Sequence, residues 1–292
     1  MRRRAPVWLL GVTLAVLGVS CDRQAASLGG SDPHDVAWLN FRLRENAEAR
    51  RWFVNVLNDT SRSDHDLAQI GLILNNSVGE GRSYDAARRD LRARLRADPD
   101  SNLASWIALM LVRLDHVPPT SDISIDLPKL LVDYASVAER YPGTLAASEA
   151  QMHHAALLAN AFDRASLEQA RATIERLLTD DPEHPYRNPL HSLLSSTLYR
   201  LELYPPALDA LIRSLETKEI DPANPVIDNA FDYFAIAVMA QFDVGDFDTA
   251  RIYYRKLADE YPRDQRNFLA DRNIADMDRI ESALRASSGG AE

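Results

Sequence analysis

The chain has 292 residues, of which 46% are hydrophobic and 26% are charged, the proportions of a globular protein that buries a core. Its formal charge is −10, and without residues 1–20 the remaining 30 basic and 43 acidic residues give −13. Because so acidic a body repels phosphate backbones, we expect no nucleic-acid partner.

The N-terminus combines three positive charges with an apolar stretch. Arg2 to Arg4 precede the uncharged segment 5–20, which is short for a membrane span and suits a secretory signal. The segment ends at Cys21, the only cysteine. This arrangement resembles a bacterial lipoprotein signal, although Gly18 stands where such signals usually carry Leu, Val or Ile. The resemblance implies that Cys21 is acylated, and two or three acyl chains make anchoring durable.

Two alternatives to lipidation stay open at this terminus. An ordinary cleaved signal is possible because Gly18 and Ser20 satisfy the small-residue rule for cleavage. The other alternative is that the apolar segment is not cleaved and itself anchors the protein in the membrane.

Residues 21–31 after the signal are small and polar and predict a flexible tether. Asp32 and Pro33 then suit the N-cap and the first position of a helix, which we expect to continue to Asn58. A second helix is predicted to begin near Ser63. Neither segment matches the repeats that follow, so residues 32–80 are predicted to form an N-terminal helical cap.

Five prolines recur after segments with helical patterning, at spacings of 43, 40, 40 and 40 residues: Pro99, Pro142, Pro182, Pro222 and Pro262. An alanine precedes four of them by twelve residues: Ala87, Ala170, Ala210 and Ala250. Proline ends a helix because it lacks an amide proton and disfavours αR in its predecessor. A small residue lets two helices approach closely. The period predicts stacked helical hairpins over residues 81–285, followed by a disordered tail over 286–292.

The repeat carries a recognisable motif in its last copy. Gly245-Asp246-Phe247 leads through Ala250 and Tyr254 to Tyr261-Pro262. This pattern resembles the second helix of the tetratricopeptide repeat (TPR) family. The resemblance implies an all-α, right-handed α-solenoid of about five antiparallel helix hairpins, with an extended binding surface. Among exported proteins, the chain is similar to the TPR lipoproteins of bacterial envelopes.

The chain departs from the TPR pattern in three ways. Its period is near 40 residues, whereas the family's is 34. In the fourth repeat, Tyr204 and Ala207 fit the motif better than Ala210 does. In the second, Leu130 stands where alanine is expected, with Tyr134 in register.

No motif in the sequence points to catalysis or to a metal. The histidine pairs lack the i,i+4 spacing that places two ligands on one helix face: His153 and His154 are adjacent, and prolines separate His184 from His191. No nucleophile motif or phosphate-binding glycine loop is present. We therefore expect no catalytic residues, no metal and no cofactor.

An aromatic residue followed by a charged one recurs late in the first helix of three repeats. When the repeats are aligned on their alanines, the equivalent pairs are Phe162-Asp163, Tyr199-Arg200 and Phe242-Asp243. Two interpretations stay open. The aromatic side chains either pack inside each hairpin or anchor a partner peptide in a groove.

These observations predict a non-catalytic protein–protein interaction scaffold, lipid-anchored at the outer or inner membrane and facing the periplasm. Its partner would be an envelope protein or peptide segment of an assembly, secretion or export complex. The alternative is a lipoprotein that binds a glycan or small ligand, which would gather its aromatic residues in one cavity.

Overall fold

The computed structural model describes residues 32–62, 64–78, 84–116, 126–161, 163–218 and 228–288. The predictions for the signal segment, the tether and Cys21 lie outside these residues. Within them every regular element is a helix, as the repeat pattern predicts. None of these helices is both long and apolar enough to cross a membrane.

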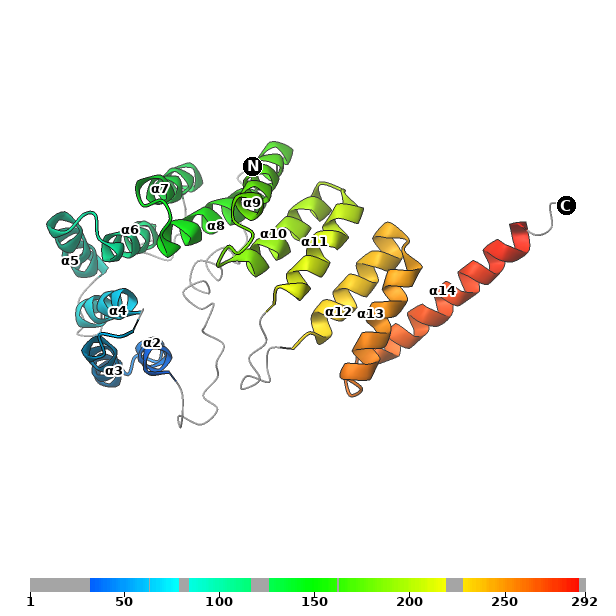
Figure 1. Cartoon of the computed structure of the whole chain (residues 1–292), viewed down its shortest axis with the longest axis horizontal. Coiled ribbons are helices and arrows are strands. Elements are labelled where there is room, and N and C mark those ends of the chain that lie inside the picture. Colours follow the sequence, from blue (N-terminus) through cyan, green and yellow to red (C-terminus); the bar gives the residue numbers. More distant parts are fainter. Residues whose placement is uncertain are drawn as a thin grey trace, which may run out of the picture. The chain divides into compact units, whose positions relative to one another are not determined.

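The chain divides into two compact units, unit 1 ending at His154 and unit 2 beginning at Ala155. The helices of unit 1 are α2 (Pro33–Arg42), α3 (Asn46–Asn58), α4 (His65–Val78), α5 (Tyr84–Ala97), α6 (Asn102–Asp115), α7 (Leu127–Arg140) and most of α8 (Leu145–Ala159). Unit 2 contains α9 (Arg164–Asp180), α10 (Arg187–Arg200), α11 (Tyr204–Glu216), α12 (Ala230–Met239), the π-helix η2 (Ala240–Val244), α13 (Phe247–Glu260) and α14 (Asn267–Ser288). In both units, most consecutive helices pack as neighbours, the arrangement of an α-solenoid (Figure 1).

The repeated prolines lie just beyond helix ends, as predicted. α5, α7, α9 and α13 end two residues before Pro99, Pro142, Pro182 and Pro262 respectively. Pro222 lies outside the described residues. The local effect of proline on its own and the preceding backbone therefore defines the repeat boundaries.

The repeated alanines are buried where helices cross. Ala87, Ala170 and Ala250 have no exposed surface, and Ala210 is 4% exposed. In the fourth repeat, Ala207 is also fully buried, and the Ser195 hydroxyl of α10 donates a hydrogen bond to its carbonyl oxygen at 2.8 Å. Since α11 begins at Tyr204 as α13 begins at Phe247, Ala207 is the residue that matches Ala250.

The predicted single helix from Pro33 to Asn58 is wrong, because the chain turns back after Arg42. Arg44 adopts a left-handed conformation (φ 62°), and the Glu45 amide donates to the carbonyl oxygen of Asn40 at 2.9 Å. The turn lets α3 pack against α2, with the rings of Trp38 and Phe53 5.2 Å apart. Burying the apolar faces of α2 and α3 stabilises the fold by more than the roughly 1–2 kcal/mol that the left-handed conformation of Arg44 costs.

Two further boundaries differ from those predicted. α4 packs against α5, with Ile70 and Leu74 in one core with Ala87 and Leu91, so the second helix of the predicted cap contributes to the first hairpin. At the other end, α14 continues to Ser288, beyond the predicted start of the tail at 286.

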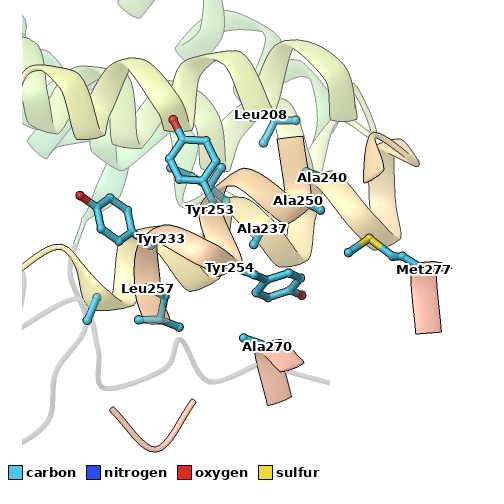
Figure 2. Packing of buried hydrophobic residues seen from close by; sticks show 12 residues of the cluster. Leu208, Tyr233, Ala237, Ala240, Ala250, Tyr253, Tyr254, Leu257, Ala270 and Met277 are labelled. Atoms are coloured by element: carbon cyan, nitrogen blue, oxygen red, sulfur yellow. The ribbon is translucent and has the colours of Figure 1, made fainter. Parts of the chain in front are cut away.

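The core of unit 2 combines alanines with tyrosines (Figure 2). Buried alanines let the backbones of the neighbouring helices approach one another: Ala237 of α12, Ala240 of η2, Ala250 of α13 and Ala270 of α14. Tyr254 fills the space between them and is fully buried. This tight packing fixes the hairpin turns described below.

Candidate functional site at the ends of α10 and η2

The turns that follow α10 and η2 each contain one left-handed residue and one closing hydrogen bond, but the bond spans five residues after α10 and six after η2. Glu202 (φ 63°) and Gly245 (φ 79°) are both left-handed. The next residue's amide donates across each turn, from Leu203 to Leu198 O at 2.9 Å and from Asp246 to Ala240 O at 2.8 Å. The bond from Leu203 has the pattern of a Schellman motif, whereas the bond from Asp246 spans one residue more because the chain is π-helical there.

Tyr199 and Phe242 occupy equivalent positions, three residues before Glu202 and Gly245 respectively. Counted from the left-handed residue, this agrees with the alignment of Tyr199-Arg200 and Phe242-Asp243, whose role in partner binding stays a prediction. Phe162 lies outside the described residues. The placement of Asp163 late in a first helix is wrong, because α8 ends at Ala159 and Asp163 is the N-cap of α9.

The π-helix determines which side chains at its turn face solvent. Gln241 is buried, and its Oε1 accepts a hydrogen bond from the Tyr254 hydroxyl at 2.9 Å. The Asn273 amide in turn donates to the Tyr254 oxygen at 2.6 Å. With Gln241 fixed inward, the next residue, Phe242, is left 64% exposed. Single π-helical turns are frequent at functional sites.

Tyr199 also presents its ring to solvent, with 41% of its surface exposed. Its ring meets that of Tyr204 edge-on at 5.3 Å, and its hydroxyl lies 3.3 Å from Oδ1 of Asp243. The Asp243 carboxylate raises the pKa of Tyr199, because a phenolate would be repelled. Tyr199, Tyr204, Phe242 and Asp243 form what we call the aromatic patch.

Arg200 and Asp163 have local structural roles. Arg200 donates to the carbonyl oxygens of Ala159 and Ala161, at and just beyond the C-terminus of α8, where carbonyl groups lack helical partners. Asp163 caps α9 by accepting from the Ser166 amide and hydroxyl, both at 2.8 Å. These bonds, the one to the amide first, lower the pKa of Asp163.

Unit 1 contains an open groove of about 260 Å³ between α5, α6 and α7. Its apolar lining includes Leu95, Leu111 and Val137, and Tyr141 is its single aromatic residue. A site with one aromatic ring offers no stacked platform for a sugar. The predicted clustering of aromatic side chains in one cavity is therefore absent from this groove.

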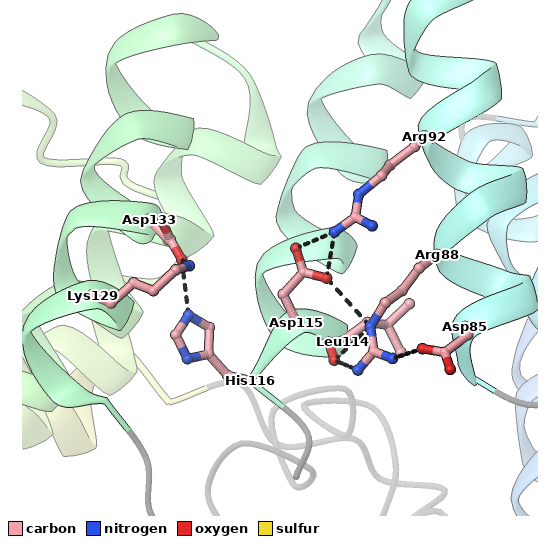
Figure 3. A network of polar contacts seen from close by, with 8 residues as sticks. All are labelled: Asp85, Arg88, Arg92, Leu114, Asp115, His116, Lys129 and Asp133. Atoms are coloured by element: carbon pink, nitrogen blue, oxygen red, sulfur yellow. Dashed lines mark hydrogen bonds and ion pairs between the residues drawn. The ribbon is translucent and has the colours of Figure 1, made fainter. Parts of the chain in front are cut away.

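The carboxylates at the groove already have cationic partners (Figure 3). Asp115 accepts two hydrogen bonds of 2.8 Å from Arg92. Asp133 is bonded by Lys129 at 2.5 Å and lies 2.8 Å from His116 Nε2. Both carboxylates are therefore neutralised. The pair Arg92–Asp115 connects α5 to α6, and the contact of His116 with Asp133 connects the end of α6 to α7.

A buried ionic cluster in unit 1 was missed by sequence reasoning. Arg113 of α6 bonds to Glu149 and His153 of α8, and His153 stacks on Tyr134 of α7. All four side chains are less than 9% exposed. The available signal was the i,i+4 spacing of Glu149 and His153, whereas the prediction considered His153 only beside His154.

This cluster joins α6, α7 and α8. Burial lowers the pKa of His153, and the same burial would raise that of Glu149, but contacts with His153 and Arg113 hold the Glu149 pKa below its usual value. In the described part of the chain, no three His, Asp or Glu side chains come close enough to hold a metal ion.

No family model matches the chain, and no curated protein matches it either. Three solved structures are similar. A tetratricopeptide repeat protein from Parabacteroides merdae is 18% identical, with 75% of this chain and 76% of that chain covered and a TM-score of 0.44. The assembly chaperone of RpL4 (Acl4, residues 1–338) is 15% identical, with 88% and 100% covered and a TM-score of 0.35. The TPR2AB domain of yeast Sti1, from its complex with pHSP90, is 12% identical, with 84% and 97% covered and a TM-score of 0.30. At these identities and TM-scores, the similarities identify neither a family nor a partner.

Proposed function

We propose that this chain is a non-catalytic, TPR-like scaffold that binds another protein, as a subunit of an assembly, secretion or export complex in the bacterial envelope. The observation that carries the proposal is the pair of exposed aromatic side chains, Tyr199 and Phe242, at equivalent hairpin turns. Two equivalent turns placing aromatic rings at the surface make an extended contact surface of the kind that helical repeats offer.

The energetics of exposure favour a binding role over a packing role for these two residues. Aromatic side chains bury 150–250 Å² when covered, at about 25 cal/mol per Å². Tyr199 and Phe242 give up much of that stabilisation in the free protein, since they remain 41% and 64% exposed. A partner that covers them recovers it, which is why aromatic residues dominate binding energy at interfaces.

Membrane attachment is the second part of the proposal, and it rests on the sequence of residues 1–21. Positive residues, an uncharged apolar segment and the single Cys21 together suit a lipoprotein signal. An acylated Cys21 would keep the scaffold at a membrane surface, facing the periplasm, without a spanning helix.

Fractionation tests the anchor. Cys21→Ser should move the protein from the membrane to the soluble periplasmic fraction and abolish its labelling by a clickable fatty acid. Retention at the membrane without labelling would point to an uncleaved signal. Release of the unaltered protein would point to ordinary secretion.

Quantitative affinity capture tests the scaffold. The full-length protein, solubilised in detergent, should retain a defined envelope protein that Tyr199→Ala/Phe242→Ala loses. Phe268→Ala is the matched control, because Phe268 is also an exposed phenylalanine of unit 2 (75%) but lies on α14. Identical capture by all three forms, each with an unchanged melting temperature, would overturn the assignment of this surface.

A further inference from the structure

We infer that the aromatic patch binds a basic segment of its partner, one in which lysine or arginine alternates with apolar residues. The inference rests on the proposed scaffold function and specifies the chemistry of the partner. Its basis is the combination of exposed rings with carboxylates that form no ion pair with any described residue.

Once residues 1–20 are removed, unit 2 carries about two thirds of the net charge of the chain. Residues 155–292 contain 24 acidic and 15 basic residues, whereas residues 21–154 contain 19 and 15. The unit that bears the patch is therefore the unit whose field attracts cations.

The acidic groups at the patch are not neutralised within the described residues. Asp243 contacts the Tyr199 hydroxyl, and neither Asp243 nor the exposed Glu202 takes part in an ion pair there. Arg200, the cation nearest in sequence to Glu202, donates to the carbonyl oxygens of Ala159 and Ala161. The groove carboxylates Asp115 and Asp133 differ in this respect, since arginine or lysine already pairs with each of them.

A basic amphipathic segment matches each part of this surface. Its apolar side chains can cover Phe242, which is fixed outward by the π-helix. Lysine or arginine can lie over the faces of Tyr199 or Phe242 and also reach the Asp243 carboxylate. An acidic segment would leave Asp243 facing a like charge, which is disfavoured across an interface.

Fluorescence anisotropy with three labelled peptides tests this specificity on the full-length protein in detergent. The peptides share their apolar positions and carry Lys/Arg, Glu/Asp or Ser/Gln at the others. The basic peptide should bind about tenfold more tightly than the neutral one, and its affinity should fall as salt rises. The acidic peptide should bind more weakly than the neutral one.

Variants then locate the binding. Phe242→Ala should weaken binding of the basic peptide about tenfold, as loss of an interface anchor does. Asp243→Asn keeps an oxygen acceptor for the Tyr199 hydroxyl but removes the negative charge. It should reduce the difference in affinity between the basic and the neutral peptide. Phe268→Ala should bind as the unaltered protein does.

Equal affinity for the three peptides would overturn the inference, as would equal losses in Phe242→Ala and Phe268→Ala. Such a result, together with partner capture that still depends on Tyr199 and Phe242, would leave the scaffold standing and reject only the basic partner. Failure of the capture experiment itself would reject the proposed function.

Discussion

Nη2 of Arg113 lies 3.0 Å from Nε2 of His153, inside unit 1. The same nitrogen lies 3.5 Å from Oε1 of Glu149. Because a guanidinium can only donate hydrogen bonds, its contact with His153 is a hydrogen bond only while Nε2 carries no proton. The contact joins α6 to α8 and makes the folded state sensitive to protonation.

The stability of unit 1 should therefore fall as the pH drops below about 6.5. Burial lowers the pKa of His153 below its ordinary value of 6.5, so the folded state binds fewer protons than the unfolded state, and its stability rises with pH across the interval between the two pKa values. The pKa of Glu149 is also lowered, so the folded state loses further stability at more acidic pH, where this carboxylate becomes protonated. Urea unfolding at a series of pH values measures this dependence.

His153→Gln is the variant that isolates the histidine. Glutamine retains an oxygen that can accept a hydrogen bond from Arg113, but it does not titrate. The free energy of unfolding should therefore change less with pH just below 6.5 in the variant. His34, His154, His184 and His191 also have lowered pKa values and remain in both proteins. An unchanged slope in the variant would show that His153 does not contribute.

Arg113→Met should destabilise the protein by about 3–5 kcal/mol. The change removes the guanidinium from the buried Glu149 carboxylate, and breaking a buried ion pair by removing one partner costs that much. Arg171→Met is the matched control, because its pair with Glu175 is solvent-exposed and should contribute no more than about 1 kcal/mol. Similar unfolding midpoints for the two variants would contradict the importance of the buried pair.

Glu202→Gly should stabilise the protein by up to about 1 kcal/mol. Glu202 adopts φ 63° at the turn after α10, where an L-residue is strained and glycine is not. The reverse change at the equivalent turn, Gly245→Ala (φ 79°), should destabilise by a similar amount. Thermal melts of both variants test the equivalence of the two turns, and shifts of the same sign would refute it.

Ala170→Arg should destabilise unit 2 by about 1–3 kcal/mol or more, because Ala170 is fully buried on α9 and a larger side chain overfills the space. Ala275→Arg on α14 places the same side chain at an exposed position and should be nearly neutral. A melting curve of Ala170→Arg identical to that of the unaltered protein would show that the register of the repeat is wrong.

Tyr254→Phe should cost about 1–3 kcal/mol, since it removes the hydroxyl that joins Gln241 to Asn273 and leaves buried polar groups without a partner. The same bond holds Gln241 inward beside Phe242, so the variant should also weaken partner binding at the patch. Tyr253→Phe, at the preceding residue, is the control. Equal stability of the two variants would argue that the Gln241 contact does not fix the π-helix.

The sequence by itself determined the helical repeat and most of its boundaries. A proline acts on its own and its predecessor's backbone, and an aspartate such as Asp246 caps the helix that begins one residue later. These effects need no distant partner, so they can be recognised from neighbouring residues. The equivalence of Tyr199 and Phe242 followed from the same periodicity.

Only the tertiary structure decided the features that depend on residues far apart in the chain. Arg44 breaks the first helix because the packing of Phe53 on Trp38 offsets its strain, and no local signal marks that turn. Arg113 reads as a lone charge until Glu149 and His153 are brought to it from another helix. The exposure of Phe242 likewise depends on Tyr254 holding the residue before it, so contacts between distant residues, and not the sequence pattern, leave this aromatic side chain facing solvent.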